Sequence, residues 1–231
     1  MSRTARSRGR RAALLLLMIS ASAATSTVTD SISIATARAL SPSKDRIPSI
    51  VPMKSSWSEP TLHPEFAEIA ERLARLRDAV APRIRLAILS NSTTAGWPEV
   101  RRGLRCFDDR YMKLDAGDPI TYATINGHGA SIGSVIDALA DLQEIVVQSM
   151  FVTDGAGEVD NTTEGALHAW LEALDRIRPE AVHVYTIDRA PARRSLRPVP
   201  RRRLREIAEQ VRSAGFPAEV FATTRARTHL N

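Results

Sequence analysis

The feature that most constrains the fold is an alternation of short apolar runs with amphipathic segments. From about Pro60 onward, runs rich in β-branched residues alternate with stretches whose apolar residues recur every three or four positions. The runs predicted as strands are 84–89, 111–114, 145–151, 182–187 and 218–221. Parallel strands need long crossovers, usually helical, so this order is typical of an α/β fold. It predicts a barrel or an open doubly wound sheet whose strands are covered on both faces.

The apolar spacing predicts five helices, one before each of these strands. They begin after Pro64, at Pro98, after the caps Ser131 and Thr163, and around Leu204. Polar residues follow every predicted strand. Proteins of this class bind ligands at the carboxyl ends of their strands. We therefore expect a ligand site at that edge, although any one of these residues could simply cap a helix.

Cysteine usage excludes several classes of site. The chain has 231 residues and a single cysteine, Cys106. It therefore has no disulfide framework, no four-thiolate zinc site and no self-contained iron–sulfur cluster. The five histidines lack metal-binding spacing, so no metal site is predicted. The net charge of +6 is compatible with RNA, DNA or an anionic surface as partner.

The N-terminal region differs from the rest of the chain. Arginines precede an apolar run at 12–19, and the small residues Ala21-Ser22-Ala23 follow it. This pattern is typical of a secretory signal and is too short to span a bilayer. A misread start would look the same. We therefore predict a low-complexity leader at 1–50, a globular unit at 51–224 and a tail at 225–231. Export through residues 1–23 is the alternative to a cytoplasmic location.

Several ordered segments resemble a known superfamily. Ser-Glu-Pro-Thr-Leu-His-Pro at 58–64 resembles the Gly-Glu-Pro-Thr-Leu-His-Pro segment of radical S-adenosylmethionine enzymes. Residues 89–92, 113–118, 147–151 and 184–191 resemble later strand ends in a branch related to the wyosine-base tRNA enzymes. The resemblance covers about residues 57–223.

The resemblance implies a partial parallel TIM-like (β/α) barrel that carries S-adenosylmethionine across its open top. In the family, a C-x3-C-x2-C loop after the first strand holds a [4Fe-4S] cluster, and a flavodoxin- or ferredoxin-like protein supplies electrons. No cysteine precedes Glu59 in this chain, so the resemblance implies a barrel missing its first βα unit. We expect a radical S-adenosylmethionine protein that is inactive as written. The alternatives are a non-catalytic descendant that binds S-adenosylmethionine or RNA, and an unrelated exported domain.

The resemblance also assigns candidate site residues, three for each role. The residues whose backbone groups would meet the methionine amino group are Ser58, Glu59 and Pro60. Those that would face the cofactor or substrate from later strand ends are Asn91, Asp115 and Gln148. Those that would border the adenine or substrate are Tyr185, Asp188 and Arg189. For 115–119, an ordinary turn is the alternative, because its glycine and proline suit one.

An arginine-rich stretch follows the strand at 182–187. Between Arg193 and Arg205 the chain carries seven arginines and no acidic residue. Such a patch is suited to the phosphates of RNA or another anionic substrate. No aromatic residues alternate with the arginines to stack bases, so a solvated loop is the alternative.

Overall fold

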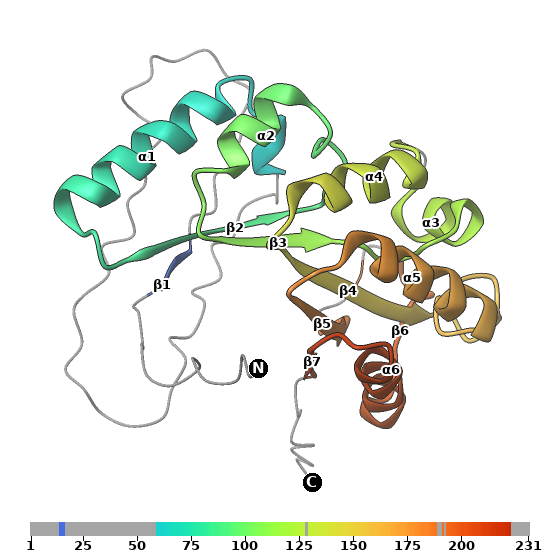
Figure 1. Cartoon of the computed structure of the whole chain (residues 1–231). Helices are drawn as coiled ribbons and strands as arrows, with labels where there is room; N and C mark the ends of the chain where they lie inside the picture. The colour runs from blue at the N-terminus through green and yellow to red at the C-terminus, as the bar shows by residue number, and fades with distance from the viewer. Residues whose placement is uncertain (1–13, 17–58, 128, 189–190, 192, 223–231) are drawn as a thin grey trace, which may run out of the picture.

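The structure is a computed structural model that describes residues 14–16, 59–127, 129–188, 191 and 193–222 (Figure 1). Its sheet has the strand order β1-β2-β3-β4-β5-β7, and every pair along this path is parallel. The short β6 pairs antiparallel with β4. The strands are β1 Leu14–Leu16, β2 Arg85–Ser90, β3 Asp109–Lys113, β4 Val146–Thr153, β5 Ala181–Thr186, β6 Arg197–Pro198 and β7 Ala218–Phe221.

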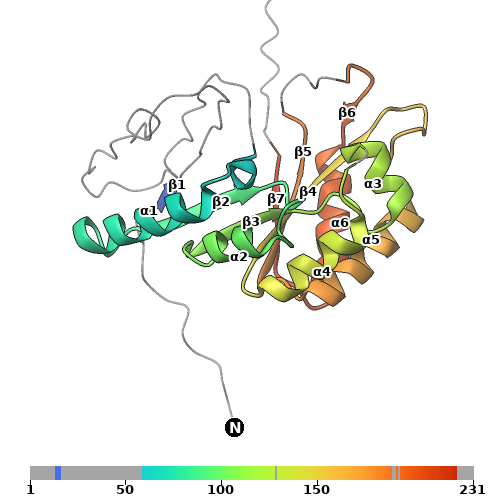
Figure 2. The same cartoon turned by 90° about the horizontal axis from the view of Figure 1, so that it is seen from above.

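Helices connect the parallel strands, as the alternation predicted. They are the 3-10 helix η1 Pro60–Leu62 and the α-helices α1 Phe66–Val80, α2 Pro98–Leu104, α3 Pro119–Asn126, α4 Ile132–Leu142, α5 Glu164–Ile177 and α6 Arg201–Ser213. Figure 2 shows α1, α2, α4 and α5 along one side of the sheet. The α/β prediction is confirmed, and every predicted strand agrees with the structure within two residues.

The hydrophobic core lies between the helices and one face of the sheet. Alternate strand residues such as Ile88, Met112, Val147 and Val182 are buried there. The remaining helical core residues include Phe66, Leu104, Trp170, Leu174, Leu204 and Ile207. Burial of these apolar side chains supplies the main stabilisation of the sheet.

The prediction that the strands are covered on both faces is wrong for the described residues. Residues that alternate with the core positions are only half-buried, and many are polar: Tyr111, Lys113, Gln148, His183 and Tyr185. Successive strand side chains point to opposite faces, so these residues share the face away from the core. We call this surface of β3, β4, β5 and β7 the polar sheet face. The strands are short and combine apolar with polar residues, so this alternation was not evident in the sequence.

The N-terminal apolar run contributes to the sheet. Leu14–Leu16 form β1, which pairs in parallel with β2 from Arg85 to Ala87. The rest of the predicted leader and the tail at 225–231 lie outside the described residues, so the domain boundaries stay predictions. Among the helices that the structure describes, none has both the length and the apolar character needed to cross a membrane.

Helix α3 was not predicted. Its N-cap is Asp118, whose Oδ1 accepts hydrogen bonds from the N–H groups of Ile120 (3.0 Å) and Thr121 (2.8 Å). Pro119 occupies the first helical position, where its fixed φ and missing N–H are tolerated. Pro119, which together with Gly117 suggested a turn, therefore starts a helix of eight residues.

Candidate functional site

The carboxylate of Glu59 joins η1 to the loop after β2. Its Oε1 accepts from the N–H (3.2 Å) and hydroxyl (2.7 Å) of Thr61, and its Oε2 accepts from the N–H of Asn91 (2.6 Å). The Thr61 hydroxyl also contacts the Thr94 hydroxyl. These bonds hold the Glu-Pro segment at the carboxyl end of β2, the edge where the sequence placed the site.

Backbone and side-chain groups near Glu59 already have local partners. The carbonyls of Glu59 and Pro60 accept from N–H groups within the 3-10 turn, at 3.1 and 3.2 Å. The Oδ1 of the exposed Asn91 accepts from the N–H (2.9 Å) and hydroxyl (2.7 Å) of Thr93. Ser58 lies outside the described residues. Because each carbonyl oxygen has a second lone pair, the backbone of Glu59 and Pro60 can still accept from a ligand.

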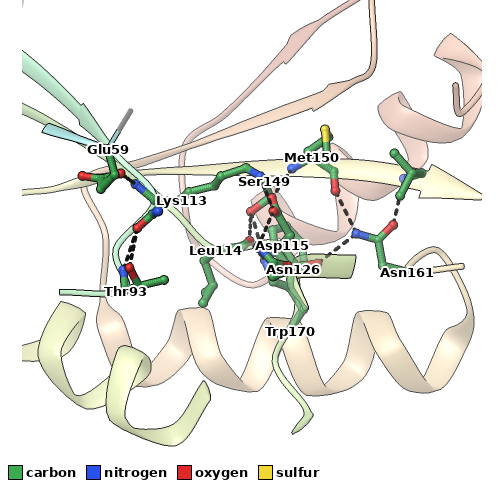
Figure 3. Close-up of polar contacts among 12 residues, drawn as sticks. Glu59, Thr93, Lys113, Leu114, Asp115, Asn126, Ser149, Met150, Asn161 and Trp170 are labelled. Carbon is green, nitrogen blue, oxygen red and sulfur yellow. Dashed lines mark hydrogen bonds and ion pairs between the residues drawn. The ribbon is translucent and has the colours of Figure 1, made fainter. Parts of the chain in front are cut away.

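Asp115 lies two residues after the end of β3 and is a fully buried candidate residue. Its side chain is 0% exposed. Oδ1 accepts from the N–H of Met150 (2.8 Å), and Oδ2 accepts from the amide of Asn126 (3.1 Å) and lies 2.6 Å from Nζ of Lys113 (Figure 3). A buried carboxylate needs such partners to remain charged. Asp115 therefore ties β3, β4 and α3 together, and Lys113 is the partner nearest the polar sheet face.

Asn161 links the same strand ends from the loop after β4. It is 2% exposed. Its Nδ2 donates to the carbonyls of Asp115 and Met150, both at 2.8 Å, and its Oδ1 accepts from the N–H of Val152 at 2.9 Å (Figure 3). These bonds use both N–H donors of the Asn161 amide and one of the two lone pairs of its oxygen.

A second buried group supports the end of β3 from the helix side. The hydroxyl of Ser149 donates to the carbonyl of Leu114 (2.6 Å). The indole N–H of Trp170 in α5 reaches both this carbonyl (3.2 Å) and the Ser149 oxygen (3.1 Å). Trp170 also packs edge-on against Phe151, with ring centroids 5.1 Å apart. The β3–β4 end is thus rigid on its core side.

The polar sheet face carries one row of side chains in register across four strands. Lys113, Gln148, His183 and Glu219 are paired neighbours on β3, β4, β5 and β7. The amide nitrogen of Gln148 lies 3.4 Å from Nδ1 of His183. The ring of His183 packs between those of Tyr111 and Phe221, with its centroid 5.6 and 4.6 Å from theirs. The row offers a cation, two neutral hydrogen-bonding groups and an anion.

Burial sets the charge state of this face. It lowers the pKa of His183, with a small opposing effect of Glu219, so the imidazole is neutral at pH 7. It raises the pKa of Tyr185 to about 12, with Asp115 adding to the shift, so the phenol keeps its proton. Burial alone would lower the pKa of Lys113, but the charge and hydrogen bond of Asp115, together with Tyr185 and Tyr122, outweigh burial, and the pKa is raised. Lys113 is therefore a stable ammonium.

The remaining predicted residues lie further out. Asp188, just after β5, is exposed. Arg189 lies outside the described residues. Asn91 and Asp115 thus lie just after the ends of β2 and β3, with Glu59 bonded to Asn91. Gln148 and Tyr185 lie within β4 and β5 on the polar sheet face, so the prediction that Gln148 stands at a strand end is wrong: it is in the first half of β4.

The arginine patch adjoins this edge. Arg193 donates to the carbonyl of Thr124 at the end of α3 (3.4 Å). Arg203 donates to a loop carbonyl and pairs with Glu206 (3.1 Å), which also lies 3.6 Å from Arg202. The exposed arginines of the patch are Arg193, Arg194, Arg197, Arg201, Arg202 and Arg205. Most of the patch charge is therefore at the surface.

The residues present do not fit an iron–sulfur cluster. The cluster type needs three thiolates, and the chain has only Cys106. Cys106 lies between α2 and the start of β3, so it is at the amino edge of the sheet, opposite the candidate site. Burial raises the pKa of its thiol, and Glu71 adds to this shift, which disfavours the thiolate that binds metal. Within the described residues no group of three or more potential ligands is placed to hold a metal ion.

No protein-family model and no curated protein matches the chain. Several solved structures match the chain. A domain of a pyruvate-formate lyase-activating enzyme from Bacteroides vulgatus is 16% identical with a TM-score of 0.54, over 71% of this chain and 95% of that one. The chain shares the fold of this domain. A radical SAM methyltransferase from Sphaerobacter thermophilus is 18% identical with a TM-score of 0.53, over 71% of this chain and 48% of the methyltransferase.

A third solved structure contains a ligand. SuiB from Streptococcus suis, bound to S-adenosylmethionine, is 10% identical with a TM-score of 0.54. The match covers 72% of this chain and 38% of SuiB, so this chain corresponds to less than half the length of SuiB and of the methyltransferase. The predicted partial barrel is confirmed at the level of the fold.

Proposed function

We propose that this chain is a radical SAM-type protein that binds S-adenosylmethionine at the carboxyl ends of its strands but does not cleave it reductively. The observation that carries the proposal is the placement of Glu59, Asn91 and Asp115 at the carboxyl ends of β2 and β3 of a radical SAM-type sheet, next to the polar sheet face that carries Gln148 and Tyr185. Ligands of open α/β sheets bind at this edge. The structure of SuiB, which shares the fold, contains bound S-adenosylmethionine.

The chemistry of this edge is compatible with that ligand. S-adenosylmethionine presents an amino group, a carboxylate, a sulfonium and a nucleoside. The carbonyls of Glu59 and Pro60 are acceptors suited to the amino group. The amide of Gln148 and the neutral phenol of Tyr185 are suited to hydroxyl or ring nitrogen atoms. The rings of the polar sheet face offer apolar surface for the nucleoside.

We also propose that the chain belongs to the branch related to the wyosine-base tRNA enzymes and that it lacks that branch's cluster-binding unit. One thiol at the amino edge supports this proposal, because a [4Fe-4S] cluster with an open iron needs three thiolates near the bound ligand. When bound, the cluster would supply the electron for reductive cleavage. Because the chain has only one thiol, we assign no reductive cleavage of S-adenosylmethionine to it.

Titration calorimetry of the purified full-length chain with S-adenosylmethionine tests the binding. We expect one saturable site, and a Gln148→Leu variant that binds about fivefold more weakly, since one neutral hydrogen bond is lost. Gln210→Leu, a change of the same kind at an exposed position of α6, should leave the affinity unchanged. No binding at millimolar ligand, or equal losses in both variants, would contradict the proposal.

A second candidate function, RNA binding, is favoured by the seven arginines without an acidic residue from Arg193 to Arg205. Filter binding of a single-stranded 20-nucleotide RNA at several salt concentrations tests it. The logarithm of the binding constant falls linearly with the logarithm of the salt concentration, and each phosphate contact adds about 0.7 to the slope. Replacing Arg194 and Arg205 with Gln should therefore reduce this slope by roughly 1.4. The same change at the exposed Arg72 and Arg83 is the control. Equal slopes in both pairs would contradict RNA binding through the patch.

A further inference from the structure

Helix α1 and the preceding η1 carry a row of apolar side chains at the surface. Leu62, Ile69, Leu73, Leu76 and Val80 follow one another at intervals of seven, four, three and four residues, which is the spacing of the apolar seam in a coiled coil. Leu62, Leu76 and Val80 are 55%, 50% and 75% exposed, and the other two are half-buried. We call these five residues the α1 stripe. Single exposed apolar residues are common, but a continuous row marks an interaction surface.

The position of α1 in the fold leaves this stripe available. The helix turns a different face, with Phe66, Ala67 and Ala70, toward the core. Figure 1 shows α1 at the end of the helical layer, where α2 is its neighbouring α-helix. Because Leu76 and Val80 are at least half exposed, no element among the described residues covers this end of the stripe.

The charges of α1 are separated along its length. Acidic residues come first and arginines follow: Glu65, Glu68 and Glu71, then Arg72, Arg75 and Arg77. Arg77 is engaged by Asp108 and Asp78, both at 2.6 Å, and Glu68 has an exposed contact with Arg102 at 3.3 Å. Within the part of the chain that the structure describes, Glu65, Arg72 and Arg75 form no ion pair. An acidic first half and a basic second half are therefore open to a partner.

Both features match a second copy of the same helix in antiparallel orientation. The acidic half of each copy then lies beside the basic half of the other, whereas a parallel pair would set like charges side by side. The apolar residues match in the same register. A two-fold axis near Glu71 places Leu62 of one copy opposite Val80 of the other and Ile69 opposite Leu73, because both pairs are centred on residue 71.

We propose that α1 is a dimerisation surface, on which a second copy of this chain packs through the same stripe in antiparallel orientation. The interface is isologous, as is usual for two-fold dimers. One pair of four-turn helices makes a small contact, so the dimer should dissociate at about micromolar concentrations. The inference does not depend on the proposed function.

Sedimentation equilibrium of the purified full-length chain, from about 5 to 200 μM, tests the proposal. We expect the average mass to rise with concentration from 25.3 kDa toward twice that value. Val80→Glu should weaken association at least about tenfold, since it places a charge in the apolar contact. Ile120→Glu, at an 81% exposed position of α3, is the matched control and should change nothing. A monomer at every concentration, or equal association of the Val80 variant and the unsubstituted chain, would overturn the proposal.

Charge reversal tests the antiparallel orientation. Arg72→Glu/Arg75→Glu makes both halves of α1 acidic, and Glu65→Arg/Glu68→Arg makes both halves basic. Each double variant alone should associate at least about tenfold more weakly than the unsubstituted chain, because like charges then meet. An equimolar mixture of the two should restore the dimer. Undiminished association of either variant alone, or a mixture that stays monomeric, would contradict the antiparallel pair.

Urea unfolding separates a second copy from a segment of the same chain as the occupant of the stripe. At about 1 μM, where the chain should be monomeric, Val80→Glu should unfold at the same urea midpoint as the unsubstituted chain, since an exposed position contributes little to stability. A clearly lower midpoint would show that the stripe is covered within the monomer and would overturn the proposal.

Discussion

Replacing Asn161 with Asp changes little in shape but removes the donors that join the ends of β3 and β4. The Asn161 amide donates to two backbone carbonyls, of Asp115 and Met150, both at 2.8 Å. A carboxylate still accepts from the Val152 N–H but places an oxygen against both carbonyls. Each buried acceptor left without a partner costs about 1–3 kcal/mol. We expect Asn161→Asp to lower the free energy of unfolding by about 3 kcal/mol or more, since burying the charge adds to this cost.

Urea unfolding at pH 7, followed by circular dichroism, measures this loss. The midpoint should fall while the slope with urea stays the same, because the surface exposed on unfolding is unchanged. Asn91→Asp is the matched control, since the exposed Asn91 uses its side-chain oxygen only as an acceptor for Thr93. It should change the free energy by less than about 0.5 kcal/mol. Equal stabilities of the two variants would refute the structural role of Asn161.

Two further predictions concern backbone approach and acid stability. A Cβ at Gly117 would overlap the carbonyl oxygen of Ala169 in α5, so Gly117→Ala should destabilise by about 3 kcal/mol in urea, whereas Gly165→Ala, with open space, should not. Burial would raise the pKa of Asp108, but a β2 backbone N–H and Arg77 lower it below the usual value. Its stabilisation is present above the unfolded pKa and lost as pH falls through the folded one. Asp108→Asn should therefore reduce stability at pH 7 and flatten its fall between about pH 5 and 2 in urea titrations, and an unchanged slope would contradict this.

The regular elements could be predicted because their periodicity is local. In α1, α4 and α5 the apolar residues recur at helical spacing, and Thr163 caps α5 as expected, with its hydroxyl accepting from the Ala166 N–H (3.3 Å). Helix α3 was missed because it spans only eight residues with little apolar periodicity. Asp118 followed by Pro119 was nevertheless a readable start signal, since Asp is a good N-cap and Pro suits the first turn.

The edge that holds the candidate site was predictable, but the roles of its residues were not. Strand ends meet at one edge in any parallel sheet, which placed Asn91 and Asp115 together, whereas Gln148 lies in the first half of β4. The burial of Asp115 depends on groups as distant as Met150, 35 residues away, and Asn161 reaches back 46 residues. Contacts over such separations leave no local pattern. One feature of the sequence pointed to Lys113: it alternates along the chain with apolar residues that face the core.

Anaerobic reconstitution of the purified 231-residue chain with iron and sulfide, followed by dithionite and S-adenosylmethionine, shows whether the chain assembles a cluster and cleaves the ligand. Product analysis by mass spectrometry accompanies the iron and sulfide assay. We expect S-adenosylmethionine to be bound and recovered intact, with no stoichiometric iron–sulfur chromophore and no 5′-deoxyadenosine. A brown protein with four irons per chain that converts the ligand into 5′-deoxyadenosine would contradict it.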